Sequence, residues 1–126
     1  MKEILITSAL AELTFAVVLG WPLNMFRMGR KKVGPFHSGK RLLQAHLDYI
    51  FMAFLQMAVA AVLPTIPPIA GWLLIVGSWT NPTLFLLGGI VPPERERSPS
   101  SVVFTMGSFA LLTIAYPWLL YAWLTR

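Results

Sequence analysis

The sequence predicts an all-α integral membrane protein, a bundle of four transmembrane helices that forms a single domain over residues 1–126. Composition is the first reason: 56% of the residues are hydrophobic and 12% are charged, whereas a soluble domain carries about 25% charged residues. The mean hydropathy of +0.68 agrees with this. The second reason is that the apolar residues fall into four separate stretches, each close to the ~20 residues that a helix needs to cross the hydrocarbon layer.

The four expected spans cover residues 4–26, 42–63, 69–91 and 101–124. The first is interpreted as a retained span, because the N-terminus lacks the basic region and small-residue cleavage site of a signal peptide. All four are expected to be helices, since open strands leave backbone groups unpaired in lipid. Glycine and proline mark the connections: a long loop over 27–41, a tight uncharged turn over 64–68 and a charged loop over 92–100.

The distribution of charge predicts the orientation of these spans. Both termini and the 64–68 turn share one side, which carries only Lys2 and Arg126, while the other side carries eight of the ten Lys and Arg residues. Because basic loops stay in the cytoplasm, we expect a multi-pass protein of a bacterial plasma membrane. Loops 27–41 and 92–100 would be cytoplasmic and both termini outside. The net charge of +5 thus reflects topology, and nucleic-acid binding is not expected, since no basic surface is interleaved with aromatic residues.

Several chemistries are excluded by what the sequence lacks. It contains no cysteine, which rules out disulfides, thiolate metal sites, iron–sulfur clusters and thiol nucleophiles. Small residues, by contrast, recur within the spans, where they let helix backbones approach closely. They predict both internal helix packing and contacts between identical chains. These residues are Ala53, Ala58, Ala60, Ala61, Gly88, Gly89, Gly107 and Ser108.

Glu12 lies within the first expected span, and a carboxylate at membrane depth is costly and commonly functional. Two interpretations stay open. Glu12 is either a protonated structural group that bonds across a helix pair or reaches the outer interface, or the proton site of a small transporter. The sequence Ala11-Glu12-Leu13 resembles the local pattern of small multidrug-resistance transporters. The longer loops and the histidine in the second span depart from that family.

His46 and Asp48 open the second span. Four residues spaced four apart place a polar stripe on one helical face, with His46 on a nearly opposite face, so the two faces are expected to meet different neighbours. The stripe contains Gln44, Asp48, Met52 and Gln56. An imidazole in hydrocarbon indicates a metal, a proton or a partner, and the alternative is an interfacial histidine bonded to a backbone carbonyl. The other histidine, His37, lies in the basic loop and is expected to be exposed.

A polar sequence, Trp-Thr-Asn-Pro, interrupts the third span at residues 79–82. Pro82 removes one backbone hydrogen bond, and Asn81 either satisfies groups freed there or faces a cavity. Asn24 is expected at the depth of His46. Asn81 would lie about 10 Å deeper at 1.5 Å per residue, so direct contact with His46 is not expected, although one ligand could span both.

Residues in the first three spans together resemble the styrene oxide isomerase family. The second span begins Gln44-Ala45-His46 and ends Leu63-Pro64, the third contains Trp79-Thr80-Asn81, and the first contains Gly20-Trp21 and Asn24. The resemblance implies a homotrimer of four-span subunits with a b-type haem between subunits. His46 would be its axial ligand, with Asn24 nearby and Arg41 paired with a propionate or, equally, a lipid headgroup. It also implies ferric haem acting as a Lewis acid on the oxygen of a small hydrophobic epoxide, which isomerises to a carbonyl while Asn81 hydrogen-bonds substrate or water.

Three positions depart from that pattern. Met52 stands where the family has Asn, Phe85 where it has Tyr, and Gly77 where it has Asp. The pocket that Met52, Phe85 and Asn81 would form is therefore more apolar, and the resemblance supports haem binding better than the isomerase reaction. Three other functions stay open: a non-catalytic haem protein or subunit, a proton-coupled transporter using Glu12, and a small structural or assembly protein.

Overall fold

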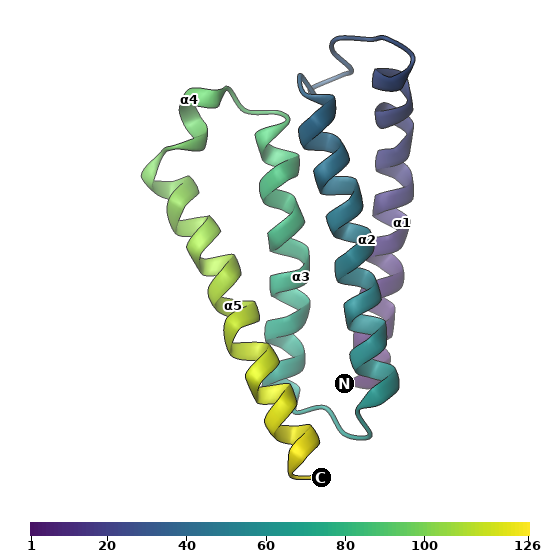
Figure 1. Cartoon of the computed structure of the whole chain (residues 1–126), viewed down its shortest axis with the longest axis vertical. Coiled ribbons are helices and arrows are strands. Elements are labelled where there is room, and N and C mark those ends of the chain that lie inside the picture. Colours follow the sequence, from purple (N-terminus) through teal and green to yellow (C-terminus); the bar gives the residue numbers. More distant parts are fainter.

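The computed structural model describes residues 1–126 and is all-helical (Figure 1). Four long helices each have the length and apolar composition needed to cross a membrane. The expected fold class and the multi-pass character are confirmed at this level. The elements are α1 (Lys2–Arg27), α2 (Gly39–Val62), α3 (Pro68–Gly88), α4 (Pro93–Glu96) and α5 (Pro99–Leu124).

Each long helix begins one to three residues before the expected span, because its first turn carries a stabilising residue. The hydroxyl of Ser38 accepts a hydrogen bond from the backbone N–H of Arg41, and Ser98 caps α5 in the same way. Proline in the first turn of α3 and α5 is already constrained to a helical φ. Hydropathy alone places the start of a span too late, because it does not count serine and proline as part of a helix even where they stabilise its first turn.

The charged loop expected over 92–100 contains a short helix, α4. Pro93 occupies its first turn and Glu94 and Glu96 lie there too, where acidic side chains favour a helix N-terminus. The third span is correspondingly shorter than expected, because α3 ends at Gly88 with Gly89 as its C-cap. The chain then has room to turn into α4 before entering the membrane again.

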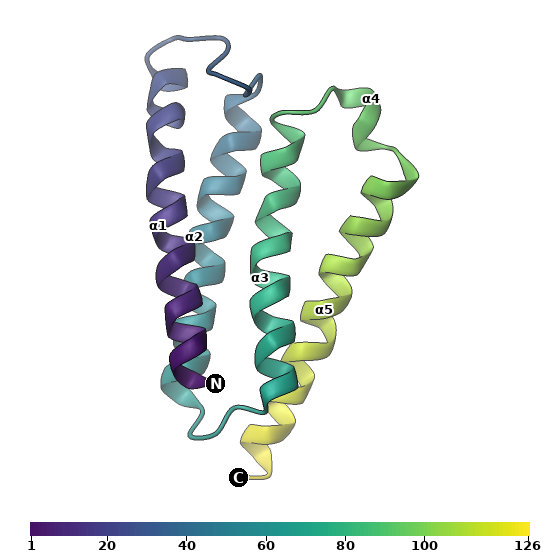
Figure 2. The same ribbon diagram turned by 180° about the vertical axis from the view of Figure 1, so that it is seen from behind.

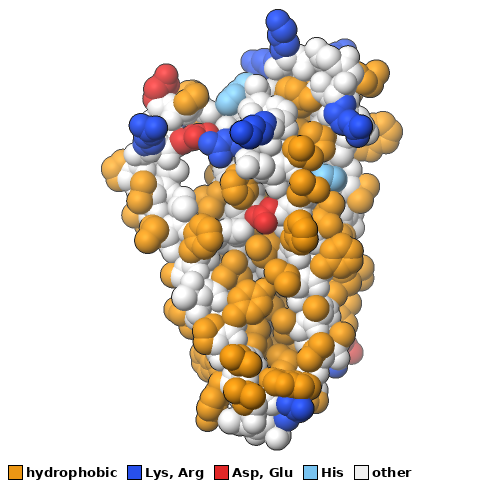
Figure 3. Space-filling view, in the orientation of Figure 1, with side chains coloured by type: hydrophobic (Ala, Val, Ile, Leu, Met, Phe, Trp, Pro, Cys, Tyr) orange, Lys and Arg blue, Asp and Glu red, His pale blue; other side chains and the backbone are white.

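The termini and the connection between α2 and α3 lie at one end of the molecule, and the 28–38 loop and α4 lie at the other (Figures 1 and 2). This is the relative arrangement that four antiparallel spans require. Charged side chains gather mainly at the end that carries α4 and the long loop, while hydrophobic side chains cover the length of the helices (Figure 3).

The helices pack in a row rather than a closed ring: α1 on α2, α2 on α3 and α3 on α5, with only a small contact between α1 and α3. Near the termini all four long helices share a core that includes Leu5, Ala60, Leu74 and Leu119. Near the loops the second core is built on α1 and α2, with α3 side chains packed on it and none from α5. α5 therefore diverges from α3 towards α4, as both ribbon views show.

Many large apolar side chains lie on the outside of this row. Only 26 of the 126 residues are buried, and the exposed side chains include large ones on every long helix, such as Trp21, Phe51, Trp72 and Phe109. A water-soluble protein would bury such surface. Its exposure along four membrane-length helices is consistent with direct contact with the lipid bilayer.

Candidate functional site

His46 lies on the face of α2 that packs against α1, and its side chain is half-buried. Its Nδ1 lies 2.7 Å from the backbone carbonyl oxygen of Ala16. A carbonyl can only accept, so Nδ1 carries the proton and donates this bond. Gly20, one turn along α1, lies beside the ring: a Cβ added there would be in van der Waals contact with it, 3.8 Å from His46 Cε1.

The backbone bond is the one that the interfacial alternative for His46 describes. It also has a chemical consequence, because in the neutral imidazole donation from Nδ1 leaves Nε2 as the nitrogen with a free lone pair. Nε2 makes no hydrogen bond within the chain and is not buried. Histidines that bind metals are commonly oriented by the same kind of bond from their other nitrogen. The donor chemistry of this side chain therefore fits one axial bond to haem iron.

A separate cavity of about 680 Å³ lies between α2, α3, α4 and α5, where α5 diverges. Its walls include Asp48, Asn81 and Phe85. The amide of Asn81 donates a 2.8 Å hydrogen bond to Asp48 Oδ2, which joins α3 to α2 across the cavity wall. Asn81 thus faces a cavity, as one of its two interpretations held, rather than satisfying backbone groups freed by Pro82.

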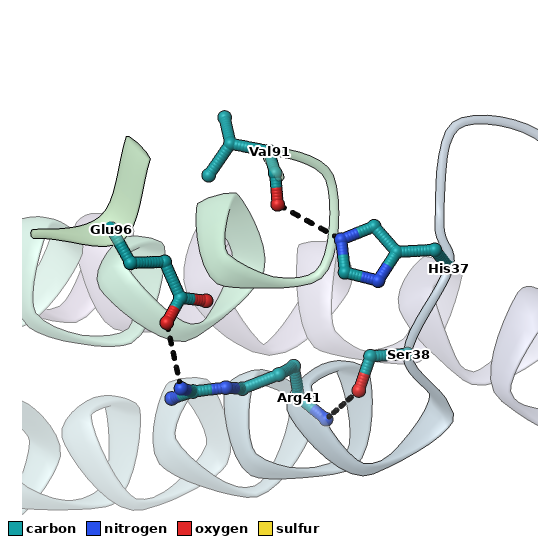
Figure 4. Close-up of polar contacts among 5 residues, drawn as sticks. All are labelled: His37, Ser38, Arg41, Val91 and Glu96. Carbon is teal, nitrogen blue, oxygen red and sulfur yellow. Dashed lines mark hydrogen bonds and ion pairs between the residues drawn. The ribbon is translucent and has the colours of Figure 1, made fainter. Parts of the chain in front are cut away.

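An ion pair borders the loop end of this cavity, and a hydrogen bond between loops lies near it (Figure 4). Arg41 Nη2 lies 3.0 Å from Glu96 Oε2, so the guanidinium pairs with α4. The expected contact of Arg41 with a propionate or a lipid headgroup stays a prediction. His37 is exposed, as expected, and its Nε2 donates to the carbonyl of Val91 at 2.9 Å. Its backbone N–H also bonds the carbonyl of Gly89. The long loop is thereby fastened to the start of the 89–98 segment.

Glu12 is completely buried between α1 and α2, with an exposed fraction of 0%. Its Oε2 accepts a 2.5 Å hydrogen bond from Nε2 of Gln56, which is also 0% exposed. Oε1 of Glu12 and Oε1 of Gln56 have no hydrogen-bond partner. This is the bond across a helix pair that the structural interpretation of Glu12 describes, and the burial closes the carboxyl group to bulk solvent.

Between these groups lies a layer of aromatic and hydroxyl side chains that ties the row of helices together. Trp79 Nε1 donates to Ser8 Oγ at 3.0 Å, which links α3 to α1. The hydroxyls of Tyr49 and Thr83 lie 2.6 Å apart and link α2 to α3. The Tyr49 ring packs edge-on at 4.9 Å from Phe15 and 6.0 Å from Trp79. These contacts join α1, α2 and α3 at the level of the layer.

The residues expected to form one site fall into two groups. Arg41, Asn81 and Phe85 line the cavity. His46 faces α1 on the other side of α2, and Asn24 lies exposed two turns along α1 from Ala16. Met52 is half-buried and is not among the residues that line the cavity.

Sequence reasoning missed the partners of three polar groups: Asn81 for Asp48, Glu96 for Arg41 and Gln56 for Glu12. The sequence did contain a signal for the pair of Glu12 and Gln56, because a buried polar group needs a polar partner on an adjacent helix, and each of the first two spans carries one. No group of three or more His, Cys, Asp or Glu side chains lies close enough together to hold a metal ion. No protein-family model matches this chain, and no curated protein matches it significantly.

Proposed function

We propose that this chain is a membrane protein that binds b-type haem through Nε2 of His46. The observation that supports the proposal is the hydrogen bond from Nδ1 to Ala16, because in the neutral ring this bond leaves Nε2 unprotonated. The interfacial alternative for His46 describes the same bond, so the choice of haem rests on the resemblance. A ring held in this way loses little rotational freedom when it binds iron, because its orientation is already set. The resemblance to the styrene oxide isomerase family supports the choice of haem among iron-containing groups.

The haem would lie between copies of the chain. One subunit offers only the face of α1 and α2 around His46, with Gly20 and Asn24 on the same side of α1, and a flat macrocycle has a second face to cover. A homotrimer, which the resemblance implies, would supply that face from a neighbour. The exposed apolar side chains of α1 and α2 are compatible with such a contact.

Held in this way, ferric haem supplies Lewis-acid chemistry toward the oxygen of a small hydrophobic epoxide, the reaction implied by the resemblance. The backbone carbonyl of Ala16 would keep the imidazole of His46 oriented. The apolar surroundings of His46 would exclude water from the reacting face. Asn81 and Phe85 on α3, and Met52 on α2, would contribute only if a neighbouring copy brought these side chains near the haem.

A second candidate, a non-catalytic haem protein, is favoured by one specific observation. Within a chain, Asn81 and Phe85 lie on the opposite side of α2 from His46. The polar group that would hydrogen-bond an epoxide is therefore not beside the iron ligand of its own subunit. Such a protein would sense, store or transfer haem, or serve a larger membrane complex.

The proposal includes an orientation. The 28–38 loop and the α4 region would face the cytoplasm of a bacterial cell and the termini the outside, because the loop end carries most of the Lys and Arg residues. Cysteine introduced at Lys31 or at Thr125 tests this with a membrane-impermeant maleimide on intact cells. The Thr125 position should be labelled and the Lys31 position protected, and the reverse pattern would invert the topology.

Haem binding is tested by the absorption spectrum of detergent-purified protein supplied with haem. We expect a Soret band in the parent, its loss in His46→Ala, and its retention in His37→Ala, which removes the other imidazole. A colourless parent, or an unchanged band in His46→Ala, would refute the proposal. The variants are compared by far-UV circular dichroism to show that both remain helical.

Turnover distinguishes the two candidates. The haem-loaded protein is incubated with an aryl epoxide, and the aldehyde product is measured by gas chromatography beside free haem in the same detergent. Aldehyde formation that His46→Ala abolishes supports the isomerase. If the protein binds haem but forms aldehyde no faster than free haem does, it is the non-catalytic form.

A further inference from the structure

The cavity between α2, α3 and α5 has the size and lining of a site for a small molecule. Its volume of about 680 Å³ falls within the range of roughly 300–1,000 Å³ that ligand pockets occupy. Leu84, Phe85, Phe104 and Phe109 give it an apolar wall from α3 and α5. The residues that hold haem in the proposed function are not part of it, so the cavity is a separate feature on the other face of α2.

Asp48 is the polar group that gives this cavity its chemical character. It lies nine residues into α2, ~14 Å along the helix axis at 1.5 Å per residue, which places it within the membrane-spanning part. Its Oδ2 accepts from Asn81. Its Oδ1 makes no hydrogen bond within the chain and is not buried. One carboxylate oxygen is therefore available to a molecule in the cavity.

No basic side chain of the protein neutralises Asp48. The cavity has two arginines in its lining, Arg41 and Arg95, both at the loop end. Arg41 is engaged with Glu96 at 3.0 Å, and that is the one ion pair in the structure. A carboxylate at membrane depth is stabilised by an opposite charge, and polar groups there commonly mark the path or site of a ligand.

The aromatic wall favours the same kind of ligand. Phe85 lies on α3, and Phe104 and Phe109 lie on α5, so rings line the cavity from two helices. The face of an aromatic ring attracts an organic cation. An anion would meet Asp48 and these rings with no unpaired basic group at that depth. A neutral ligand could at most donate a hydrogen bond to the Asp48 oxygen and would leave its negative charge unbalanced.

We propose that this cavity binds a small lipophilic organic cation, with its ammonium group beside Asp48 and its apolar body against the phenylalanine wall. The bond from Asn81 holds the carboxylate in position, and the Arg41–Glu96 pair borders the loop end of the site. The site does not depend on haem, since His46 faces α1.

The probe is benzyltrimethylammonium, whose positive charge does not vary with pH, and the counter-probe is benzenesulfonate, which has one ring and the opposite charge. Binding to the parent in a maltoside detergent is measured by saturation-transfer NMR and calorimetry. We expect the cation to bind and the anion not to. Equal binding of both probes, or of neither, would overturn the proposal.

Variants locate the site. Asp48→Asn keeps the shape and an acceptor for Asn81 but removes the charge, and should weaken cation binding at least tenfold. Glu3→Gln removes one negative charge from the exposed start of α1 and is the matched control, with unchanged affinity expected. Leu84→Trp fills the cavity without altering charge and should also weaken binding.

Folding of each variant is checked by circular dichroism and gel filtration. If Asp48→Asn does not fold, Leu84→Trp still decides whether the cation occupies the cavity. Parent-like affinity in a folded Asp48→Asn or Leu84→Trp variant contradicts the assignment. Because the assay uses protein without added haem, its failure is distinct from failure of the proposed function.

Discussion

The buried pair of Glu12 and Gln56 allows a quantitative prediction about the stability of the bundle. Both side chains are 0% exposed and share one hydrogen bond. Glu12→Leu leaves the amide of Gln56 without its acceptor, and Gln56→Leu leaves Glu12 without its donor. A buried polar group that loses its partner costs about 1–3 kcal/mol. Bonds between helices in a membrane average about 0.6 kcal/mol because the unfolded chain also finds partners there.

We therefore expect each single variant to lower the free energy of unfolding by about 1–2 kcal/mol. The double variant Glu12→Leu/Gln56→Leu should be less destabilised than the sum of the two, with a coupling of ~1 kcal/mol. Replacing both partners with apolar side chains removes the unpaired groups, including the two oxygens that already lack a partner. Glu12→Gln keeps an oxygen that can accept from Gln56 and should cost less than about 1 kcal/mol.

The assay is unfolding in maltoside micelles titrated with SDS, followed by circular dichroism. Glu3→Gln, at an exposed site on the same helix, is the control and should leave the midpoint unchanged. Additive single effects would show that the two side chains are not energetically coupled and would refute the structural interpretation of Glu12. An equally large stability loss in Glu12→Gln and Glu12→Leu would instead indicate that the carboxyl group itself is required.

Two further predictions concern contacts between helices, and both use the same unfolding assay. Gly77→Ala should destabilise the bundle by about 1–2 kcal/mol, because the added Cβ would lie 2.6 Å from Leu112 Cδ2 on α5. Gly107→Ala, whose Cβ would meet nothing within 4 Å, should be neutral or slightly stabilising. If the two alanine variants are equally stable, α3 and α5 are not in close contact at Gly77. Trp79→Phe loses the donor to Ser8 and should cost about 1 kcal/mol, and an unchanged midpoint would mean that this bond contributes nothing.

The four helices could be predicted from the sequence because composition, length and proline positions all constrain them directly. The polar stripe on α2 shows where this reasoning stops. Residues four apart drift by about 40° per step around a helix of 3.6 residues per turn. Over the eight residues from Asp48 to Gln56 the stripe turns by about 80°, so Asp48 meets α3 while Gln56 meets α1. A central helix with neighbours on both sides divides such a stripe between them.

The same geometry explains what was correct about the candidate site. Two residues that are two positions apart point about 200° away from each other around a helix. His46 meets α1 and Asp48 meets α3, so the expectation that they meet different neighbours is confirmed. The partner of Asn81 could not be predicted. Depth along the membrane follows from counting residues, but the rotation of α3 about its own axis is set by packing against α2 and α5. That rotation turns Asn81 toward Asp48.

The need for a second copy depends on haem rather than on apolar surface. A row of four helices leaves α1 and α5 as edges, and in water such exposed Phe, Trp and Leu side chains would require cover. Lipid tails cover them equally well, so exposure alone does not favour association. A haem bound at His46 changes this, because one face of α1 and α2 cannot enclose both sides of a macrocycle. If His46 binds no haem, the strongest reason for an oligomer disappears, while the cavity beside Asp48 is complete within one chain.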